Sequence, residues 1–273
     1  MDTGKSGRSW YSRPRSSSPF SDLGRSRRYG FRPVSTDRYV AFDIETAKVL
    51  PESVTDLMDY RPLGVACAAA AVSGQEEPVI WHGQNGGTPA AQMSRDEVRV
   101  MVNDLAAWVD EGYTLVSWNG LSFDFNILAE ESGMPEECAR LALEHLDMMF
   151  HVVCRLGYPV ALGKAAEGFG IPGKSGGLSG YDAPVFWAQG RYEDVLDYNV
   201  QDARLALTIA QESERREEFV WITRRGSKSR MPLDQGWCSV RQALELPLPD
   251  TSWMSDPPAR EDFLAWLPLG SRI

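Results

Sequence analysis

The sequence contains few of the residues that build thiol or imidazole chemistry. Its 273 residues include four cysteines and three histidines. The cysteines are scattered without a C-x-x-C pair, so free or buried thiols in a reducing compartment are a better interpretation than a disulfide or zinc framework. The histidines lack the spacing of metal ligands on one helix, and we interpret them as structural. These residues are Cys67, Cys138, Cys154, Cys238, His82, His145 and His151.

Long apolar runs are also absent. No run approaches the roughly 18 residues that a membrane-spanning helix needs. The N-terminus lacks the apolar core of a secretory signal peptide. We therefore expect no membrane segment and a cytoplasmic location.

The chain lacks an overall excess of positive charge. Its net charge is −10, although residues 1–38 carry nine Lys/Arg and three Asp, a net of +6, which leaves −16 for residues 39–273. An acidic body argues against proteins that bind long stretches of duplex tightly, because phosphate contacts require cations.

The basic N-terminal segment has the composition of a disordered tail. Residues 1–37 are rich in Ser, Arg, Gly and Pro and show little periodicity, which predicts disorder. Two interpretations stay open, namely a basic arm that attracts nucleic acid and a solvated tail without a specific role.

Two carboxylates follow an apolar run at residues 39–46. Val, Tyr and Phe in this run predict a strand that is buried on both faces. Side chains alternate along a strand, so Asp43 and Glu45 point to the same side. A divalent cation that prefers oxygen ligands, magnesium or manganese, would relieve their mutual repulsion. A strand that ends in solvated acids would give the same pattern.

Two later segments supply further acidic residues. Residues 115–120 predict a second buried strand that ends in a turn, and residues 123–128 open a helix with Asp124 in its first turn. Farther along, an amphipathic helix contains Tyr198 and Asp202, which are four residues apart and therefore share one face.

In chain order these segments read D-x-E, N-x-x-x-F-D and Y-x-x-x-D, a set that resembles the DEDD superfamily of 3′-to-5′ exonucleases over roughly residues 38–212. The tyrosine is typical of the DEDDy branch, since the histidine branch has a histidine where this chain has Asp197. Residues 162–202 are most similar to stand-alone exonucleases that resemble family-B DNA polymerase proofreading domains. The residues that carry the resemblance are Asp43, Glu45, Asn119, Phe123, Asp124, Tyr198 and Asp202.

The resemblance implies two-metal phosphodiester hydrolysis with two divalent cations, Mg²⁺ or Mn²⁺. It implies that Asp43 bridges both cations, and that Glu45 and Asp202 complete the site of the attacking water. Asp124 would support the second cation, either directly or through water.

Further roles also follow from the resemblance. The Tyr198 hydroxyl would orient the attacking water, because a neutral phenol is a weak base. Thr46, Asn119 and Phe123 would contact the terminal nucleotide. For Phe123, a core position is the alternative interpretation.

Periodicity and the resemblance together predict an α/β fold of the ribonuclease-H-like type. Strands at residues 38–44, 63–72 and 77–82 have short links and should form an antiparallel meander. Helix-linked strands at residues 114–118 and 146–150 would complete a mixed five-stranded sheet flanked by helices. The predicted helices span residues 94–110, 123–128, 136–145, 161–169, 181–189, 191–212 and 240–244, and a further strand is predicted at residues 219–223.

These elements divide the chain into a tail at residues 1–37, a catalytic domain at residues 38–216 and an extension at residues 217–273. The extension is rich in proline and contains Trp237, Trp253 and Trp266. These large side chains favour burial, so we expect the extension to wrap around and pack on the domain.

One motif match is rejected on its context. Residues 168–175 fit G-x-x-x-x-G-K-S, but a phosphate-binding loop needs a strand before it and a helix after it. Residues 161–169 are predicted to be helical, and Pro172 removes a backbone donor. We therefore do not predict nucleotide hydrolysis.

Two function classes stay open. The first is an exonuclease that releases nucleoside 5′-monophosphates from the 3′ end of single-stranded nucleic acid, DNA in preference to RNA, with DNA repair as its context. The second is a catalytically inactive nucleic-acid-binding or scaffold protein with the same fold. The complete set of four acids and a tyrosine favours the enzyme. The expected partner is the 3′ end of a single strand, and the sequence does not identify protein partners.

Overall fold

The computed structural model describes residues 38–51, 53–54, 56–172 and 180–271. The predicted tail at residues 1–37 lies outside them. So does Lys174, the lysine of the rejected phosphate-loop match.

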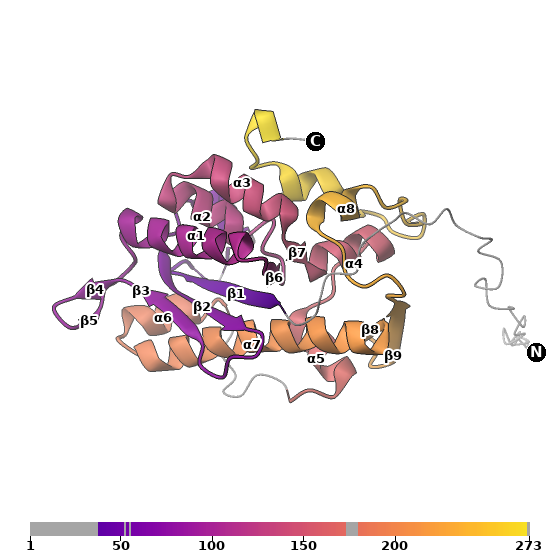
Figure 1. Cartoon of the computed structure of the whole chain (residues 1–273), viewed down its shortest axis with the longest axis horizontal. Coiled ribbons are helices and arrows are strands. Elements are labelled where there is room, and N and C mark those ends of the chain that lie inside the picture. The colour runs from indigo at the N-terminus through magenta and orange to yellow at the C-terminus, as the bar shows by residue number, and fades with distance from the viewer. Residues whose placement is uncertain (1–37, 52, 55, 173–179, 272–273) are drawn as a thin grey trace, which may run out of the picture. The chain divides into compact units, whose positions relative to one another are not determined.

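A mixed sheet of five strands organises the described chain, in the order β3-β2-β1-β6-β7 (Figure 1). β1 (Tyr39–Thr46), β2 (Val65–Val72) and β3 (Val79–His82) form an antiparallel meander. β6 (Thr114–Ser117) and β7 (Leu146–Asp147) add parallel to β1. This arrangement confirms the predicted sheet. Helical connections precede both parallel strands, as parallel pairing requires.

The central strand β1 divides its side chains between two layers of helices. Alternate residues of a strand point to opposite faces. Val40, Phe42 and Ile44 therefore join one core cluster, whereas Tyr39 and Ala41 join another. In Figure 1 the helices α1 to α3 lie above the sheet, and α5 and α7 lie below it.

The first layer consists of α1 (Arg95–Asp110), α2 (Asp124–Ser132) and α3 (Pro135–Glu144). α1 begins with a capping box, in which the Ser94 side chain accepts from the Glu97 N–H and the Glu97 side chain accepts from the Ser94 N–H, so two otherwise unpaired donors are satisfied. Large apolar side chains from this layer pack on Phe42 and its neighbours.

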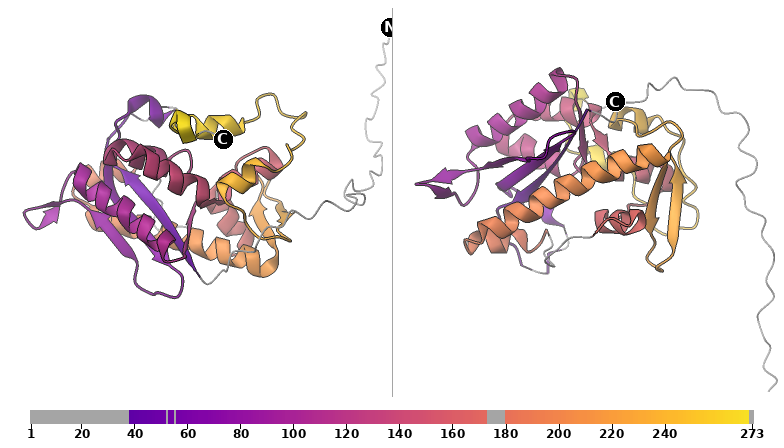
Figure 2. Two further views of the ribbon diagram at one scale, coloured as in Figure 1. Left: turned by 45° about the horizontal axis from the view of Figure 1, so that its top comes forward. Right: turned by 60° about the horizontal axis from the view of Figure 1, so that its bottom comes forward.

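The second layer consists of α5 (Leu162–Phe169), α6 (Ala183–Ala188) and α7 (Tyr192–Arg216). α7 is the longest of these helices and crosses the sheet on the face opposite α1 (Figure 2). It packs against both β1 and β2.

One predicted strand is wrong in most of its length. Residues 146–150 were expected to be extended, but β7 has two residues and α4 (Met148–Leu156) begins directly after it. The side chain of Asp147 caps α4 by accepting from the Phe150 N–H. The run is apolar and buried nearly all round, so periodicity does not separate helix from strand here.

Two short hairpins were not predicted as hairpins, although one of their four strands was predicted. β4 (Gln84–Asn85) and β5 (Thr88–Pro89) pair within a glycine-rich loop. β8 (Glu218–Ile222) pairs with β9 (Lys228–Pro232) after the end of α7. The predicted strand at residues 219–223 corresponds to β8.

The C-terminal segment contacts the domain through specific hydrogen bonds. It contains α8 (Val240–Leu244), η2 (Arg260–Leu264) and η3 (Leu269–Ser271). Arg260 is 8% exposed, and its guanidinium donates to four backbone carbonyls. Of these carbonyls, that of Cys154 belongs to α4, and those of Leu244, Leu246 and Pro247 belong to the C-terminal segment itself. Trp253, which was expected to be buried, is 66% exposed.

None of the helices in the described ranges combines the length and the apolar character needed to cross a lipid bilayer.

Candidate metal and active site

Three carboxylates converge where β1 meets α7. Asp43 and Glu45 come from β1, Asp202 comes from α7, and each offers a ligand oxygen within 4.8 Å of the others. Glu45 is 5% exposed and Asp202 is 6% exposed. The two β1 carboxylates lie on one face, as their alternation in the sequence predicts. Withdrawing several like charges from water is unfavourable unless a cation or hydrogen bonds compensate.

Small side chains allow α7 to approach the sheet closely at this point. On this face of β2 lie Ala69 and Ala71, which pack against Ala203 of α7. Ala69 is the partner of Asp43 in the β1–β2 ladder. Because Ala203 follows Asp202, the alanine contact holds the α7 carboxylate next to those of β1.

Tyr198 lies one turn before Asp202 on the same face of α7 and is 5% exposed. Its pKa is raised well above the ordinary value, mainly by burial and further by the charges of Asp202, Glu45 and Asp43 and a hydrogen bond to Asp202. The phenol is therefore neutral and can act as a hydrogen-bond donor.

The negative charge of these carboxylates also affects a neighbouring cysteine. Cys67 is the ladder partner of Glu45, so the two side chains lie on one face of the sheet. Burial raises the pKa of the Cys67 thiol, and the charges of Glu45 and Asp43 raise it further. A cluster of oxygen ligands in a negative field matches the donor preference of a hard divalent cation. The residues present therefore fit such an ion.

Asp124 lies beside this cluster without belonging to it. It is 3% exposed, and its Oδ1 accepts from the Ile44 N–H at 3.1 Å, between the two β1 acids in the chain. Burial raises the pKa of Asp124; hydrogen bonds from Ile44 and from its own backbone lower it, and the charge of Asp147 raises it. Asp124 thus ties the N-terminus of α2 to the acidic part of β1.

Asp147 stabilises the turn before α2 by accepting two hydrogen bonds from its backbone. Its two carboxylate oxygens accept from the Asn119 N–H at 3.0 Å and the Leu121 N–H at 2.9 Å. Asn119 has φ 73°, a left-handed conformation that Asn tolerates better than most residues. Its Oδ1 accepts from the Ser122 hydroxyl. The structure therefore gives Asn119 a role in shaping the turn.

A cavity of about 440 Å³ opens over the acids. Of the predicted substrate contacts, Thr46 and Phe123 line it. The sequence did not single out Leu57 or Tyr181 as cavity residues; Tyr181 was expected to begin a helix, but α6 starts only at Ala183. The complete lining is Asp43, Ile44, Glu45, Thr46, Leu57, Phe123, Gly180, Tyr181, Tyr198 and Asp202.

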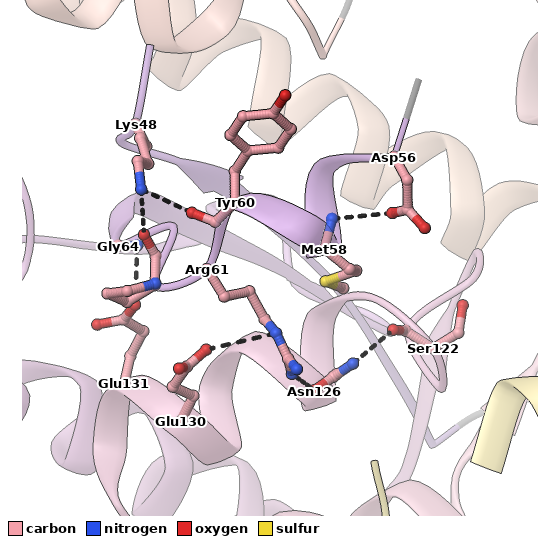
Figure 3. Close-up of polar contacts among 11 residues, drawn as sticks. Lys48, Asp56, Met58, Tyr60, Arg61, Gly64, Ser122, Asn126, Glu130 and Glu131 are labelled. Atoms are coloured by element: carbon pink, nitrogen blue, oxygen red, sulfur yellow. Dashed lines mark hydrogen bonds and ion pairs between the residues drawn. The ribbon is translucent and has the colours of Figure 1, made fainter. Parts of the chain in front are cut away.

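Hydrogen bonds anchor the segment that carries Leu57, in η1 (Leu57–Tyr60), as Figure 3 shows. The Lys48 ammonium donates to the Tyr60 carbonyl at 2.6 Å. Arg61 donates to the Asn126 side chain of α2 at 3.0 Å. The Arg61 contact attaches this segment to the helix that begins with Asp124, and the Lys48 contact attaches it to the chain that follows β1.

Asn199 is a further residue that the sequence analysis did not identify. It is fully buried, and its Nδ2 donates to Asp43 Oδ2 at 2.7 Å. The only feature of the sequence that could have pointed to Asn199 was its place between Tyr198 and Asp202 in the chain. Helical spacing alone does not predict contact with a strand 156 residues earlier.

The buried histidines are engaged in structural contacts. His145 Nε2 lies 2.9 Å from the Ser117 hydroxyl, and His151 Nδ1 lies 3.2 Å from the Cys238 sulfur. Burial lowers the pKa of both histidines, to about 3 for His151, and raises the pKa of Cys238 to about 12. The Cys238–His151 pair is therefore neutral and does not supply a thiolate nucleophile.

A search of curated proteins found no match. Residues 79–213 match the family model described as RNase_H superfamily. This segment contains Asp124, Tyr198 and Asp202 but not the β1 acids. Members of that superfamily are typically metal-dependent nucleases, and the match and the sheet order together establish a ribonuclease-H-like fold.

Proposed function

We propose that the protein is a metal-dependent 3′-to-5′ exonuclease of the DEDDy type that acts on single-stranded nucleic acid, with DNA as the preferred substrate. The observation that carries this proposal is the convergence of Asp43, Glu45 and Asp202 with the neutral phenol of Tyr198 at one cavity. An inactive binding protein would have no need of this combination, because buried like charges are destabilising without a cation.

The acids have separate tasks in this proposal. Asp43, Glu45 and Asp202 would hold two divalent cations, Mg²⁺ or Mn²⁺. Such ions, when bound, activate water and stabilise the leaving oxygen of a phosphodiester. Asp124 fixes the backbone between the two β1 ligands through the Ile44 N–H, and would support the second cation.

The tyrosine acts through its hydroxyl hydrogen. Its raised pKa keeps the proton on the oxygen at neutral pH, so Tyr198 positions the attacking water and does not remove a proton from it. Asp202 lies one turn away and accepts from the same hydroxyl. Orientation of the water and placement of the metal ligand are therefore linked along α7.

The cavity suits the end of a strand. Its volume of about 440 Å³ falls in the range of about 300–1,000 Å³ that is usual for small-ligand sites. Leu57, Phe123 and Tyr181 add apolar surface to the cavity that the acids line, which fits an unpaired base next to its phosphate. Thr46 lines the same cavity, and we assign it a contact with the terminal nucleotide.

A cleavage assay tests the proposal. Oligonucleotides labelled at the 5′ end, as DNA and RNA, single-stranded and duplex, are incubated with the full-length protein and Mg²⁺ or Mn²⁺. We expect single-stranded DNA to shorten stepwise from its 3′ end with release of nucleoside 5′-monophosphates. A circular single strand should resist, because it has no end.

The controls separate the possible activities. Addition of EDTA should stop cleavage, and the Asp43→Asn variant should be inactive. Cleavage of the circular strand would show an endonuclease, and binding without any cleavage in either metal would show a non-catalytic nucleic-acid-binding protein. Either outcome would contradict the proposed exonuclease.

A further inference from the structure

The structure assigns Asn199 as a positioning residue for Asp43: its amide aligns the Asp43 carboxylate for cation binding before any cation arrives. The expected effect of Asn199 on catalysis rests on the proposed function. Its expected effect on metal affinity rests on the observed contact alone. The Asn199 Nδ2 lies 2.7 Å from Asp43 Oδ2, which is at the short end for an N–H···O bond and typical of an ionised acceptor.

The chemistry of the pair determines which amide atom faces the carboxylate. An ionised carboxylate only accepts hydrogen bonds, whereas an amide has a donating nitrogen and an accepting oxygen. A flipped amide would set two oxygens against each other. The Asn199 nitrogen therefore faces Asp43, as the 2.7 Å contact with Oδ2 shows.

The surroundings of Asn199 argue against a purely structural role. One turn before it and one turn after it, the same buried stripe of α7 carries Val195 and Ala203. A third apolar residue would complete this stripe without polar atoms. Instead, the Asn199 Oδ1 is buried without a hydrogen-bond partner among the described residues, which is unfavourable for stability. The contact with Asp43 is the compensating gain.

An amide also suits this position because it carries no net charge. A lysine or arginine next to Asp43 would bring a full positive charge that competes with a cation for the carboxylate. The amide donates one hydrogen bond without adding charge, and a carboxylate has about four lone-pair sites. The contact with Asn199 therefore occupies one of these sites and restricts the rotation of the carboxylate.

The test compares Asn199→Leu, which removes the donor and stays close in size, with Asn199→Ala, which removes it without inserting new atoms. The matched control is Ser213→Ala. Ser213 is also fully buried on α7, and its hydroxyl donates to the Ile209 carbonyl at 2.6 Å. Mn²⁺ affinity of the full chain is measured by calorimetry without nucleic acid, and Tm is measured in EDTA and in Mn²⁺.

We expect both Asn199 variants to bind Mn²⁺ about 10–100-fold more weakly than the wild type, the usual effect of removing a partner of a metal ligand. Their single-turnover cleavage should need correspondingly more metal. Ser213→Ala should lower Tm in EDTA without changing the Mn²⁺ dissociation constant.

Each other outcome has a defined meaning. If either Asn199 variant is folded and binds Mn²⁺ as the wild type does, the inference is overturned, whatever happens to Tm. A fall in metal affinity of similar size in Ser213→Ala would also overturn it, because the effect would then follow from general loosening of α7. If the wild type binds Mn²⁺ through Asn199-dependent contacts but cleaves no nucleic acid, the proposed function fails and this inference stands.

Discussion

The two faces of β1 differ in polarity and charge, although their residues alternate along one strand. Phe42 and Ile44 face α1 and α2, where Phe42 packs edge-on against Phe125 at 5.1 Å between ring centroids. Asp43 and Glu45 face α7, where the neighbouring side chains are small or polar. One face is thus apolar along its length, whereas the other combines the apolar core contacts of Tyr39 and Ala41 with a cluster of like charges.

The comparison shows how a fold can hold an unfavourable cluster in place. The apolar face and the antiparallel pairing with β2 fix the backbone of β1. The acids on the other face then have little freedom to move apart. Single substitutions at adjacent residues of β1 should therefore change either the stability of the fold or the catalytic activity.

The largest effect is expected from Asp43→Asn. The change keeps the size of the side chain but removes the charge of a ligand that both cations would share. Cleavage should fall by at least about 10³-fold, because metal ions supply several kcal/mol of transition-state stabilisation. Tm in EDTA should stay the same or rise, since repulsion in the cluster decreases. Single-turnover cleavage and a thermal melt check both; a variant within tenfold of wild type would contradict the metal assignment.

Phe42→Ala should show the opposite pattern. Removing a fully buried phenylalanine typically lowers the free energy of unfolding by about 3–5 kcal/mol. The cleavage rate per folded molecule should remain close to that of the wild type, because the acids lie on the other face. Denaturant unfolding measures the first quantity, and cleavage corrected for the folded fraction measures the second. A loss of activity beyond that correction would show that the faces are coupled.

Tyr198→Phe tests the role of a single hydroxyl next to the acids on the α7 face of β1. The ring and its packing remain, and only the hydroxyl is lost. The chemical step should slow by about 10–10³-fold, the scale of one positioned polar contact, while Mn²⁺ affinity stays near wild type. If the rate is unchanged, Tyr198 is structural. If metal affinity falls as much as in Asp202→Asn, Tyr198 supports the metal site itself.

Leucine substitutions at two adjacent alanines of β2 test the role of close packing. Ala69 faces α7, and Ala68 faces the opposite core. Overpacking should destabilise both variants by about 1–3 kcal/mol. Cleavage per folded molecule should fall for Ala69→Leu, because the added side chain displaces α7 and with it Asp202. Equal activity losses in Ala68→Leu and Ala69→Leu would refute a specific role for the alanine contact.

The smallest effect concerns the other end of the β1–α7 contact. There the Tyr39 hydroxyl donates to Glu214 Oε1 at 2.6 Å. Burial raises the pKa of Glu214, and hydrogen bonds from Tyr39 and the Trp237 N–H lower it. The folded state therefore binds a proton more readily than the unfolded state, whose Glu pKa is about 4.3.

The sign of the pH dependence follows from this shift. The contribution of Glu214 to stability should increase as the pH falls through its raised pKa, and level off below about 4.3. Glu214→Gln should remove that part of the dependence and be slightly more stable near neutral pH. Thermal melts of metal-free protein between neutral and mildly acidic pH measure the difference. A parallel pH profile for wild type and variant would contradict the assignment.

Local patterns predicted the features that depend on neighbours in the chain. The alternation at Asp43 and Glu45 gave their common side, and the four-residue spacing gave the shared face of Tyr198 and Asp202. The meander and the parallel strands also followed, because short links and helical connections restrict the topology. The resemblance to a nuclease family connected these separate patterns.

Features that depend on contacts between distant segments were not predicted. Asn199 was missed because its partner lies in β1. Leu57 was missed because η1 owes its position over the cavity to anchors such as Lys48 and Arg61. The first turn of α4 was predicted as part of a strand because its apolar residues are buried nearly all round. In each case the information lies in three-dimensional packing.

The central claim is that the α7 face of β1 binds divalent cations. Crystals of the full-length protein soaked in Mn²⁺ test it most directly, because manganese scatters anomalously and can be located without assumptions. We predict anomalous peaks in contact with the carboxylates of Asp43, Glu45 and Asp202 in the wild type, and their loss in Asp43→Asn. Saturating Mn²⁺ without a peak at these carboxylates would contradict the account.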